Sequence, residues 1–162
     1  MPLPRGLLRL TDEELDELLS TEKTLRIGTV AKDGTPHVAP MWFLWKDGVI
    51  WLNSLRRSRR TSDLASGSKV ALCVDAGEVY WELKGAVLYG VPHEANDDPD
   101  MPAARKAFAM KNWGIEDLPD TKSHVWLKMI PEKIVSWDFK KIPPAKDPRV
   151  KYGPKPPEAS SA

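Results

Sequence analysis

The segment IWLNSLRRSRRTSDL, residues 50–64, changes from an apolar strand to a run of arginines within a few positions. Its first three residues have the apolar character of a buried strand, and arginines then occupy positions 56, 57, 59 and 60. Guanidinium groups match the geometry of phosphate with paired N–H donors, and a helix beginning near Thr61 or Ser62 would add free backbone N–H groups. The segment predicts an anion cradle, but a solvated basic loop fits these residues equally well when they are taken alone.

The rest of the chain has the composition of a soluble globular protein. Its 162 residues suit one domain, with 41% hydrophobic and 29% charged residues, which are ordinary values for such proteins. No apolar run approaches the roughly 20 residues that a membrane span needs. The N-terminal MPLPRGLLRL is too short and too poor in apolar residues for a secretory signal. We therefore expect a cytoplasmic protein with no membrane partner.

The net charge argues against a nucleic-acid-binding protein, and the cysteine content excludes an intramolecular disulfide. A formal net charge of +1 argues against a nucleic-acid-binding protein with a broad basic surface. Binding of nucleic acid by the arginines and the basic tail is therefore only a weak alternative. Cys73 is the only cysteine, so no intramolecular disulfide can form. It lies in the apolar run 70–74, which predicts a buried structural thiol.

The pattern before the arginines predicts a helix followed by a three-stranded meander. Thr11 and Glu14 form a capping box that opens a helix over residues 11–20. Strands over residues 25–31, 35–45 and 49–53 are separated by Asp-Gly turns. Pro36 and Pro40 have no N–H for a central ladder, so the second strand must lie at an edge or be bulged around Pro40.

The pattern after the arginines predicts four more strands and a second helix. The strands cover residues 69–75, 78–90, 123–130 and 134–139, and the helix covers residues 102–113. Gly85, inside the long strand, indicates a bend or bulge of the kind that a small barrel needs. Residues 1–141 therefore form one domain, and the proline-rich, basic tail 142–162 is expected to be extended or disordered.

No catalytic constellation or metal site is evident. The chain has no nucleophile elbow, no phosphate-binding glycine loop and no Cys-x-x-Cys pair. His37, His93 and His124 lack the spacing of metal ligands. His37 deserves most notice, because it lies at the irregular start of the second strand. A strand-rich body with an anion cradle and no nucleophile is typical of a protein whose reactive chemistry comes from a bound cofactor.

Five segments together resemble a known family. They are LRIGTVAKDGTPHVAPMWFLW (25–45), IWLNSLRRSRRTSDL (50–64), KVALCVD (69–75), VYWELKGAVLYG (79–90) and VWLKMIPEKIVSWDF (125–139). In this order they resemble the pyridoxamine-5'-phosphate-oxidase-like superfamily, and within it the actinobacterial flavin/deazaflavin oxidoreductases, some of which use coenzyme F420. The resemblance implies a mainly β fold, a Greek-key split β-barrel of the FMN-binding type with flanking helices. It also implies a homodimer with cofactor sites at the interface.

The resemblance also implies where the cofactor is bound. Segment 38–42 corresponds to the strand along the tricyclic ring, the end of strand 49–53 and the arginines after it correspond to the phosphate site, and a tryptophan of the last strand reaches the partner's site. Arg60 stands where the family usually has lysine. The implied cofactor-binding residues are Val38, Pro40, Met41, Trp42, Asn53, Ser54, Arg56, Arg59, Arg60 and Trp137.

The implied activity is hydride transfer between bound F420 or FMN and a small conjugated organic substrate. F420 is favoured over FMN, because extra arginines suit its anionic oligoglutamate tail. Tyr80, Lys84 and His37 are candidate proton donors among which the sequence does not select. Oxidation of vitamin B6 is not expected, since the only arginine near the C-terminus is Arg149. A non-catalytic flavin- or haem-binding carrier or sensor is the alternative.

Overall fold

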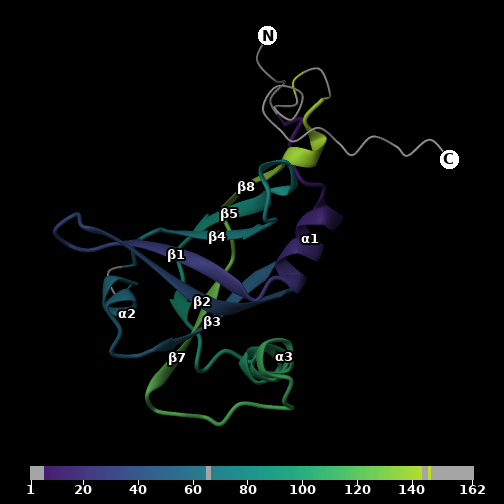
Figure 1. The fold of residues 1–162 in the computed structure, drawn as a ribbon. Coiled ribbons are helices and arrows are strands. Elements are labelled where there is room, and N and C mark those ends of the chain that lie inside the picture. Colours follow the sequence, from purple (N-terminus) through teal and green to yellow (C-terminus); the bar gives the residue numbers. More distant parts are fainter. Residues whose placement is uncertain (1–5, 65–66, 144–145, 147–162) are drawn as a thin grey trace.

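A computed structural model describes residues 6–64, 67–143 and 146, and strands dominate this part of the chain. Eight strands, three α-helices and two short 3-10 helices occur within it (Figure 1). In chain order they are α1 (Asp12–Thr21), β1 (Thr24–Val30), β2 (Pro36–Lys46), β3 (Val49–Leu55), α2 (Arg59–Leu64), β4 (Val70–Ala76), η1 (Tyr80–Glu82), β5 (Lys84–Gly90), β6 (His93–Glu94), α3 (Met101–Trp113), β7 (His124–Met129), β8 (Lys133–Asp138) and η2 (Phe139–Lys141). The mainly β class with flanking helices is confirmed.

The strands form one curled sheet in the order β6-β7-β3-β2-β1-β4-β5-β8, with antiparallel neighbours throughout. The predicted meander of β1, β2 and β3 is confirmed. β2 changes its neighbour halfway along: Pro36 to Trp42 pair with β1, and Phe43 to Lys46 pair with β3. Pro40 therefore lies where β2 has a single paired neighbour among the described strands, as its missing N–H requires.

The prediction of a strand over residues 78–90 is wrong in its first part. Tyr80–Glu82 form a 3-10 helix, and β5 begins only at Lys84. Gly77 explains the change, because it has φ 104° and a Cβ there would lie 2.5 Å from the carbonyl oxygen of Glu82. The chain thus folds back tightly on itself, and the Tyr80 ring packs 4.9 Å from the ring of Phe139.

Two smaller expectations also change, and one short strand was not predicted. The helix after the arginines begins at Arg59, earlier than expected, and the two-residue strand β6 was not predicted. Cys73 is partly exposed rather than buried, since it lies on the outward-facing side of β4. The tail prediction falls on residues that lie almost entirely outside the described part. No described helix combines the length and the apolar character needed to cross a membrane.

Two clusters of buried side chains hold the sheet and its helices together. The larger one lies on the inner face of the sheet and includes Leu18 and Leu19 of α1, whose predicted capping box is present. The smaller one lies between the outer face and α3, where the rings of Phe108 and Trp126 meet edge to face at 5.3 Å. Each face of the sheet is therefore partly covered by a helix.

The C-terminal end of α3 is fixed to β2 and α1 by two neighbouring side chains. Asn112 donates from Nδ2 to the carbonyl oxygen of Phe43 at 3.2 Å. Lys111 donates from Nζ to the carbonyl oxygen of Leu19 at 2.9 Å and lies 4.0 Å from the centre of the Phe43 ring. Burial lowers the pKa of Lys111 to about 8. These contacts hold in place the helix end that borders the candidate site.

Candidate functional site

An exposed row of side chains runs along the half of β2 that pairs with β1 alone. Side chains alternate between the faces of a strand, and Val38, Pro40 and Trp42 share the outer face. Val38 is 67% exposed and Trp42 is 36% exposed. Met41 points the other way into the core, where it is 9% exposed, so only its backbone faces the surroundings. The row offers an apolar surface for a flat molecule.

A cluster of hydroxyl groups holds α2 against the end of β3. The buried Ser54 Oγ lies 3.0 Å from Thr61 Oγ1, and Ser58 Oγ lies 3.0 Å from the same atom. Thr61 in turn donates to the carbonyl oxygen of Leu55 at 3.0 Å. Ser54 is 0% exposed, so its hydroxyl positions α2 and is closed to an external ligand. The neighbouring Asn53 faces the opposite side of the strand.

Arg60 is held against this cluster. Its Nε donates to Ser54 Oγ at 3.3 Å, and burial lowers its pKa. No carboxylate among the described residues forms an ion pair with it. A partly buried cation with only a neutral partner is destabilised. An anion that reached the remaining guanidinium donors would offset that cost.

The other arginines occupy different surroundings. Arg59 is exposed and lies near the β1–β2 turn, where hydrogen bonds from Thr35 and then the charge of Arg59 lower the pKa of Asp33. Arg56 forms an ion pair with Glu94 at 3.1 Å. Arg56 and Arg57 also border a basic cavity of about 510 Å³. Its lining is Leu55, Arg56, Arg57, Ser58, Lys122 and Ser123. This basic cavity is a second place where an anion can bind.

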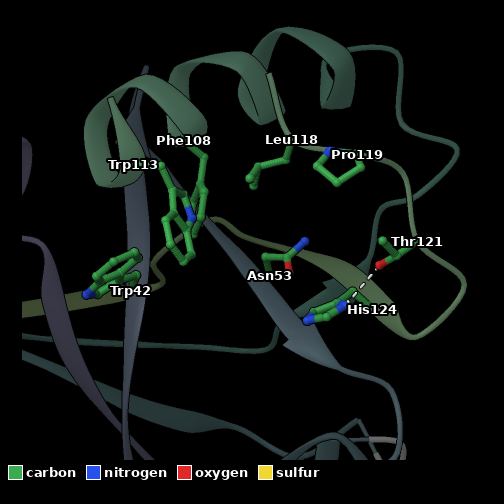
Figure 2. A pocket seen from close by; sticks show the side chains of 8 residues that line it. All are labelled: Trp42, Asn53, Phe108, Trp113, Leu118, Pro119, Thr121 and His124. Carbon is green, nitrogen blue, oxygen red and sulfur yellow. Dashed lines mark hydrogen bonds between the residues drawn. The ribbon is translucent and has the colours of Figure 1, made fainter. Parts of the chain in front are cut away.

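An aromatic cavity of about 350 Å³ lies at the other end of the β2 row (Figure 2). Trp42 from β2 and Trp113 from the end of α3 meet at 4.9 Å with their planes at 74°. The full lining is Trp42, Asn53, Phe108, Trp113, Leu118, Pro119, Thr121 and His124. None of these side chains is a carboxylate, ammonium or guanidinium group. The cavity suits a small, mostly apolar molecule with a few polar contacts.

The segment after α3 closes this cavity on one side. The helix ends at Gly114, which has the left-handed φ of 70° typical of a helix C-terminus. Arg105 then holds Asp117 with two hydrogen bonds, of 2.7 and 2.9 Å. Asp117 also accepts a bond from the backbone N–H of Leu118 at 2.9 Å, and the bond from Arg105 is the main reason that its pKa is lowered. These contacts fix Leu118 and Pro119 as part of the wall.

The structure brings some of the predicted residues together and separates others. Trp42 and Asn53 both line the aromatic cavity, with Val38 and Pro40 continuing from it along β2. Trp137 does not join them: it lies on β8, at the far end of the strand order, across Gly85. His37 points toward the inner side, and its Nδ1 is buried without a hydrogen-bond partner in the described part of the chain.

Sequence reasoning missed six residues of the cavity: Phe108, Trp113, Leu118, Pro119, Thr121 and His124. Trp113 could have been predicted, because it is the last residue before Gly114, which ends the helix. A large aromatic side chain at a helix end is free to pack against a neighbouring element. Phe108 and His124 carried no such signal, because their place depends on how α3 and β7 pack onto β3.

Comparison with known proteins identifies the family. Residues 11–138 match the family model described as pyridoxamine 5'-phosphate oxidase. No curated protein matches the chain. Among solved structures, a conserved hypothetical protein from Mycobacterium tuberculosis is 21% identical, with a TM-score of 0.75 over 86% of this chain and 92% of its own. A FAD-binding protein from Mycobacterium smegmatis is 23% identical, with a TM-score of 0.62 over 78% and 95%.

A structure described as an F420 reductase is 18% identical, with a TM-score of 0.57 over 82% of this chain and 98% of that one. At these identities the likeness concerns the fold, which is the split barrel that the sequence resemblance implied. The match to the family model covers most of the chain. The chain therefore belongs to the pyridoxamine 5'-phosphate oxidase family.

Proposed function

We propose that the protein is an oxidoreductase that binds a deazaflavin or flavin and transfers a hydride between it and a small conjugated organic substrate. One observation carries the proposal: the exposed apolar row on β2 has Arg59 of α2 near the turn at one end and the aromatic cavity at the other. The five residues of extended chain from Val38 to Trp42 span four residue steps, or about 13 Å. A flat ring system on this row would lie between a phosphate site and a substrate cavity.

The phosphate end is supported by charge and burial. Arg60 is partly buried without a described counter-charge, and Arg59 is exposed nearby on the first turn of α2. Both guanidinium groups suit a phosphate, which accepts paired N–H donors. In this assignment Ser54 acts indirectly, by orienting Arg60 through its hydroxyl oxygen. The donor set therefore fits a phosphate-bearing cofactor.

Coenzyme F420 is our preferred cofactor, and FMN is the close second. The basic cavity with Arg56, Arg57 and Lys122 supplies cations beyond those needed for one phosphate. F420 carries further anionic groups in its tail, whereas FMN has a single phosphate. The likeness to an F420 reductase and to a FAD-binding protein supports a cofactor of this class. When bound, it would supply the hydride chemistry that the chain's own side chains lack.

The chain's own residues would orient the reactants. The aromatic walls at Trp42 and Trp113 keep a substrate next to the β2 row, and the loop fixed by Arg105 and Asp117 closes the cavity. Holding the cofactor and the substrate in contact in this way converts a bimolecular reaction into an effectively unimolecular one.

We also propose that a second copy of the chain completes the site. The exposed side chains of Val38, Pro40 and Trp42 form a contiguous apolar strip on one face of β2, and such patches commonly mark interaction surfaces. Trp137 lies on β8 and does not line the cavity, so in this proposal it would contact the cofactor held by the other copy. Light scattering of the purified protein would test this, and a monomer at cofactor-saturating concentration would contradict it.

Titration of the purified protein with F420 and with FMN tests the proposed function. We expect dissociation constants of about 1 μM or tighter for at least one of them, or about −8 kcal/mol of binding free energy. Turnover is then measured by following oxidation of the reduced cofactor with conjugated ketones. Binding without turnover of any acceptor would favour a carrier or sensor, and failure to bind either cofactor would exclude the proposal.

A further inference from the structure

We propose that the aromatic cavity is a substrate subsite selective for an uncharged, flat, conjugated molecule, whose oxygen is held by Asn53 and His124. The assignment of this ligand as the substrate rests on the proposed function, whereas the selectivity for an uncharged ligand follows from the residues that line the cavity. Neither His124 nor the walls contributed by α3 were expected from the sequence.

The walls favour a flat ring. Trp42 and Trp113 meet edge to face at 4.9 Å, and Phe108 is held edge to face against Trp126 at 5.3 Å. Aromatic side chains contact a planar ligand with a large apolar area at little entropic cost, because they have few rotatable bonds. Asn112 anchors the helix end that carries Trp113. The walls are therefore in place before a ligand arrives.

Two polar groups in the cavity remain unused. The side-chain amide of Asn53 has no hydrogen-bond partner among the described residues. His124 uses only Nδ1, which lies 2.9 Å from Thr121 Oγ1 and 3.0 Å from Ser123 Oγ. Its Nε2 has no partner in the same part of the chain. Figure 2 shows the Asn53 amide pointing into the cavity, and the His124 ring with Nδ1 turned toward Thr121.

The sheet register places these two groups close together. Asn53 pairs with Trp126, and Leu55 pairs with His124, on the neighbouring strands β3 and β7. Asn53 and His124 are thus diagonal neighbours on one face of the sheet, a relation that puts side chains within reach of each other. A single carbonyl oxygen can accept hydrogen bonds from two such groups. Together they would fix the orientation of a ketone between the aromatic walls.

The charge of the lining decides the class of ligand. No carboxylate, ammonium or guanidinium group lines this cavity, so an ionised ligand would lose its water without gaining a counter-charge. Anions have an alternative in the basic cavity, with Arg56, Arg57 and Lys122. A ketone and a carboxylate of the same size should therefore be well separated in affinity.

The test uses the full-length, cofactor-free protein and two matched probes, 2-acetylnaphthalene and 2-naphthoate. They share a ring system and a carbonyl-type oxygen, and only the second is ionised. Affinity is measured by NMR titration, which also reports on the indole N–H of Trp42 and Trp113 and on the side-chain amide of Asn53. We expect the ketone to shift these three signals and to bind at least about 10-fold more tightly than the carboxylate.

Substitutions of His124 and Asn53 test whether these two side chains cause the preference for the ketone. His124→Phe should weaken ketone binding about 5- to 10-fold, as expected for one lost hydrogen bond. His93→Phe is the matched control, because His93 is exposed on β6 and lies outside this cavity; it should leave the affinity unchanged. Asn53→Leu provides a second variant with the same expected loss. Equal affinity for the two probes, or equal effects of His124→Phe and His93→Phe, would overturn the inference.

The outcome is separable from that of the proposed function. Ketone binding at the three reporter signals without any binding of F420 or FMN would support the subsite while removing the proposed oxidoreductase. Binding of F420 or FMN without a preference for the ketone would support the proposed oxidoreductase and remove the proposed subsite.

Discussion

Replacing Arg60 with methionine should separate cofactor binding from protein stability. Arg60 is partly buried beside Ser54, with no described carboxylate to pair with it. In the cofactor-free protein the guanidinium therefore brings a desolvation cost together with one hydrogen bond. In the complex that we propose, it gains a phosphate partner. The same substitution should then have a small effect on folding and a large effect on binding.

The expected magnitudes follow from these contacts. Losing the bond to Ser54 costs about 1 kcal/mol, and removing an unpaired, partly buried cation returns a similar amount. Arg60→Met should therefore change the unfolding free energy by no more than about 1 kcal/mol. A hydrogen bond to a charged group contributes about 1.5–3 kcal/mol, so the dissociation constant for FMN should rise about 10- to 150-fold.

Urea unfolding and FMN titration of the same preparations measure both quantities. Arg57→Met is the control, because Arg57 is exposed and lines the separate basic cavity; it should leave FMN affinity nearly unchanged while weakening F420. If Arg57→Met and Arg60→Met weaken FMN equally, or if Arg60→Met leaves FMN affinity intact, the phosphate assignment is wrong.

Three further substitutions test other contacts. Gly85→Ala should lower the unfolding free energy by about 1–3 kcal/mol, because its Cβ would lie 2.5 Å from Trp137 Cζ2 and 2.9 Å from the Val74 carbonyl oxygen; an unchanged melting temperature would refute this. Arg105→Met should weaken binding of 2-acetylnaphthalene but not of FMN in titrations, because it releases Asp117 and the wall at Leu118; equal losses would contradict it. Burial lowers the pKa of Lys111 from 10.5 to about 8, so the folded state loses this proton first as pH rises. Wild type should therefore gain stability relative to Lys111→Met between about pH 8 and 10.5 in urea unfolding, and a constant difference would exclude this.

Local signals were sufficient for most of the fold. The capping box at Thr11 and Glu14 depends on residues three apart, and it forms as predicted. The turn between β2 and β3 was readable from Asp47 and Gly48, which both adopt positive φ, at 53° and 77°. The position of Pro40 followed from its missing N–H. In each case the residues that determine the structure are neighbours in the sequence.

The errors arose where distant segments decide the local structure. The alternation in residues 78–83 fits a strand, but the approach of Gly77 to Glu82 and the packing of Tyr80 on Phe139 produce a 3-10 helix. No local pattern contains that contact. Similarly, Phe108 and His124 reach the aromatic cavity only because α3 and β7 pack beside β3.

One part of the site could have been refined from the sequence. Asn53 and Ser54 were grouped as phosphate contacts, yet adjacent residues of a strand face opposite sides. The structure gives Ser54 a buried role in holding α2 and gives Asn53 a place in the aromatic cavity. The cluster of arginines, in contrast, was evident from the order of residues in the sequence, and only the burial and ion pairs of these arginines required the fold.

The molecule that the protein retains on purification tests the central claim most directly. The full chain would be expressed in a host that makes both F420 and flavins, and the bound molecule would be identified by absorbance and mass, with the Arg60→Met variant purified in parallel. We predict a deazaflavin or flavin bound to the wild type and depleted in the variant. A bound haem, or a deazaflavin or flavin retained equally by both proteins, would contradict the account.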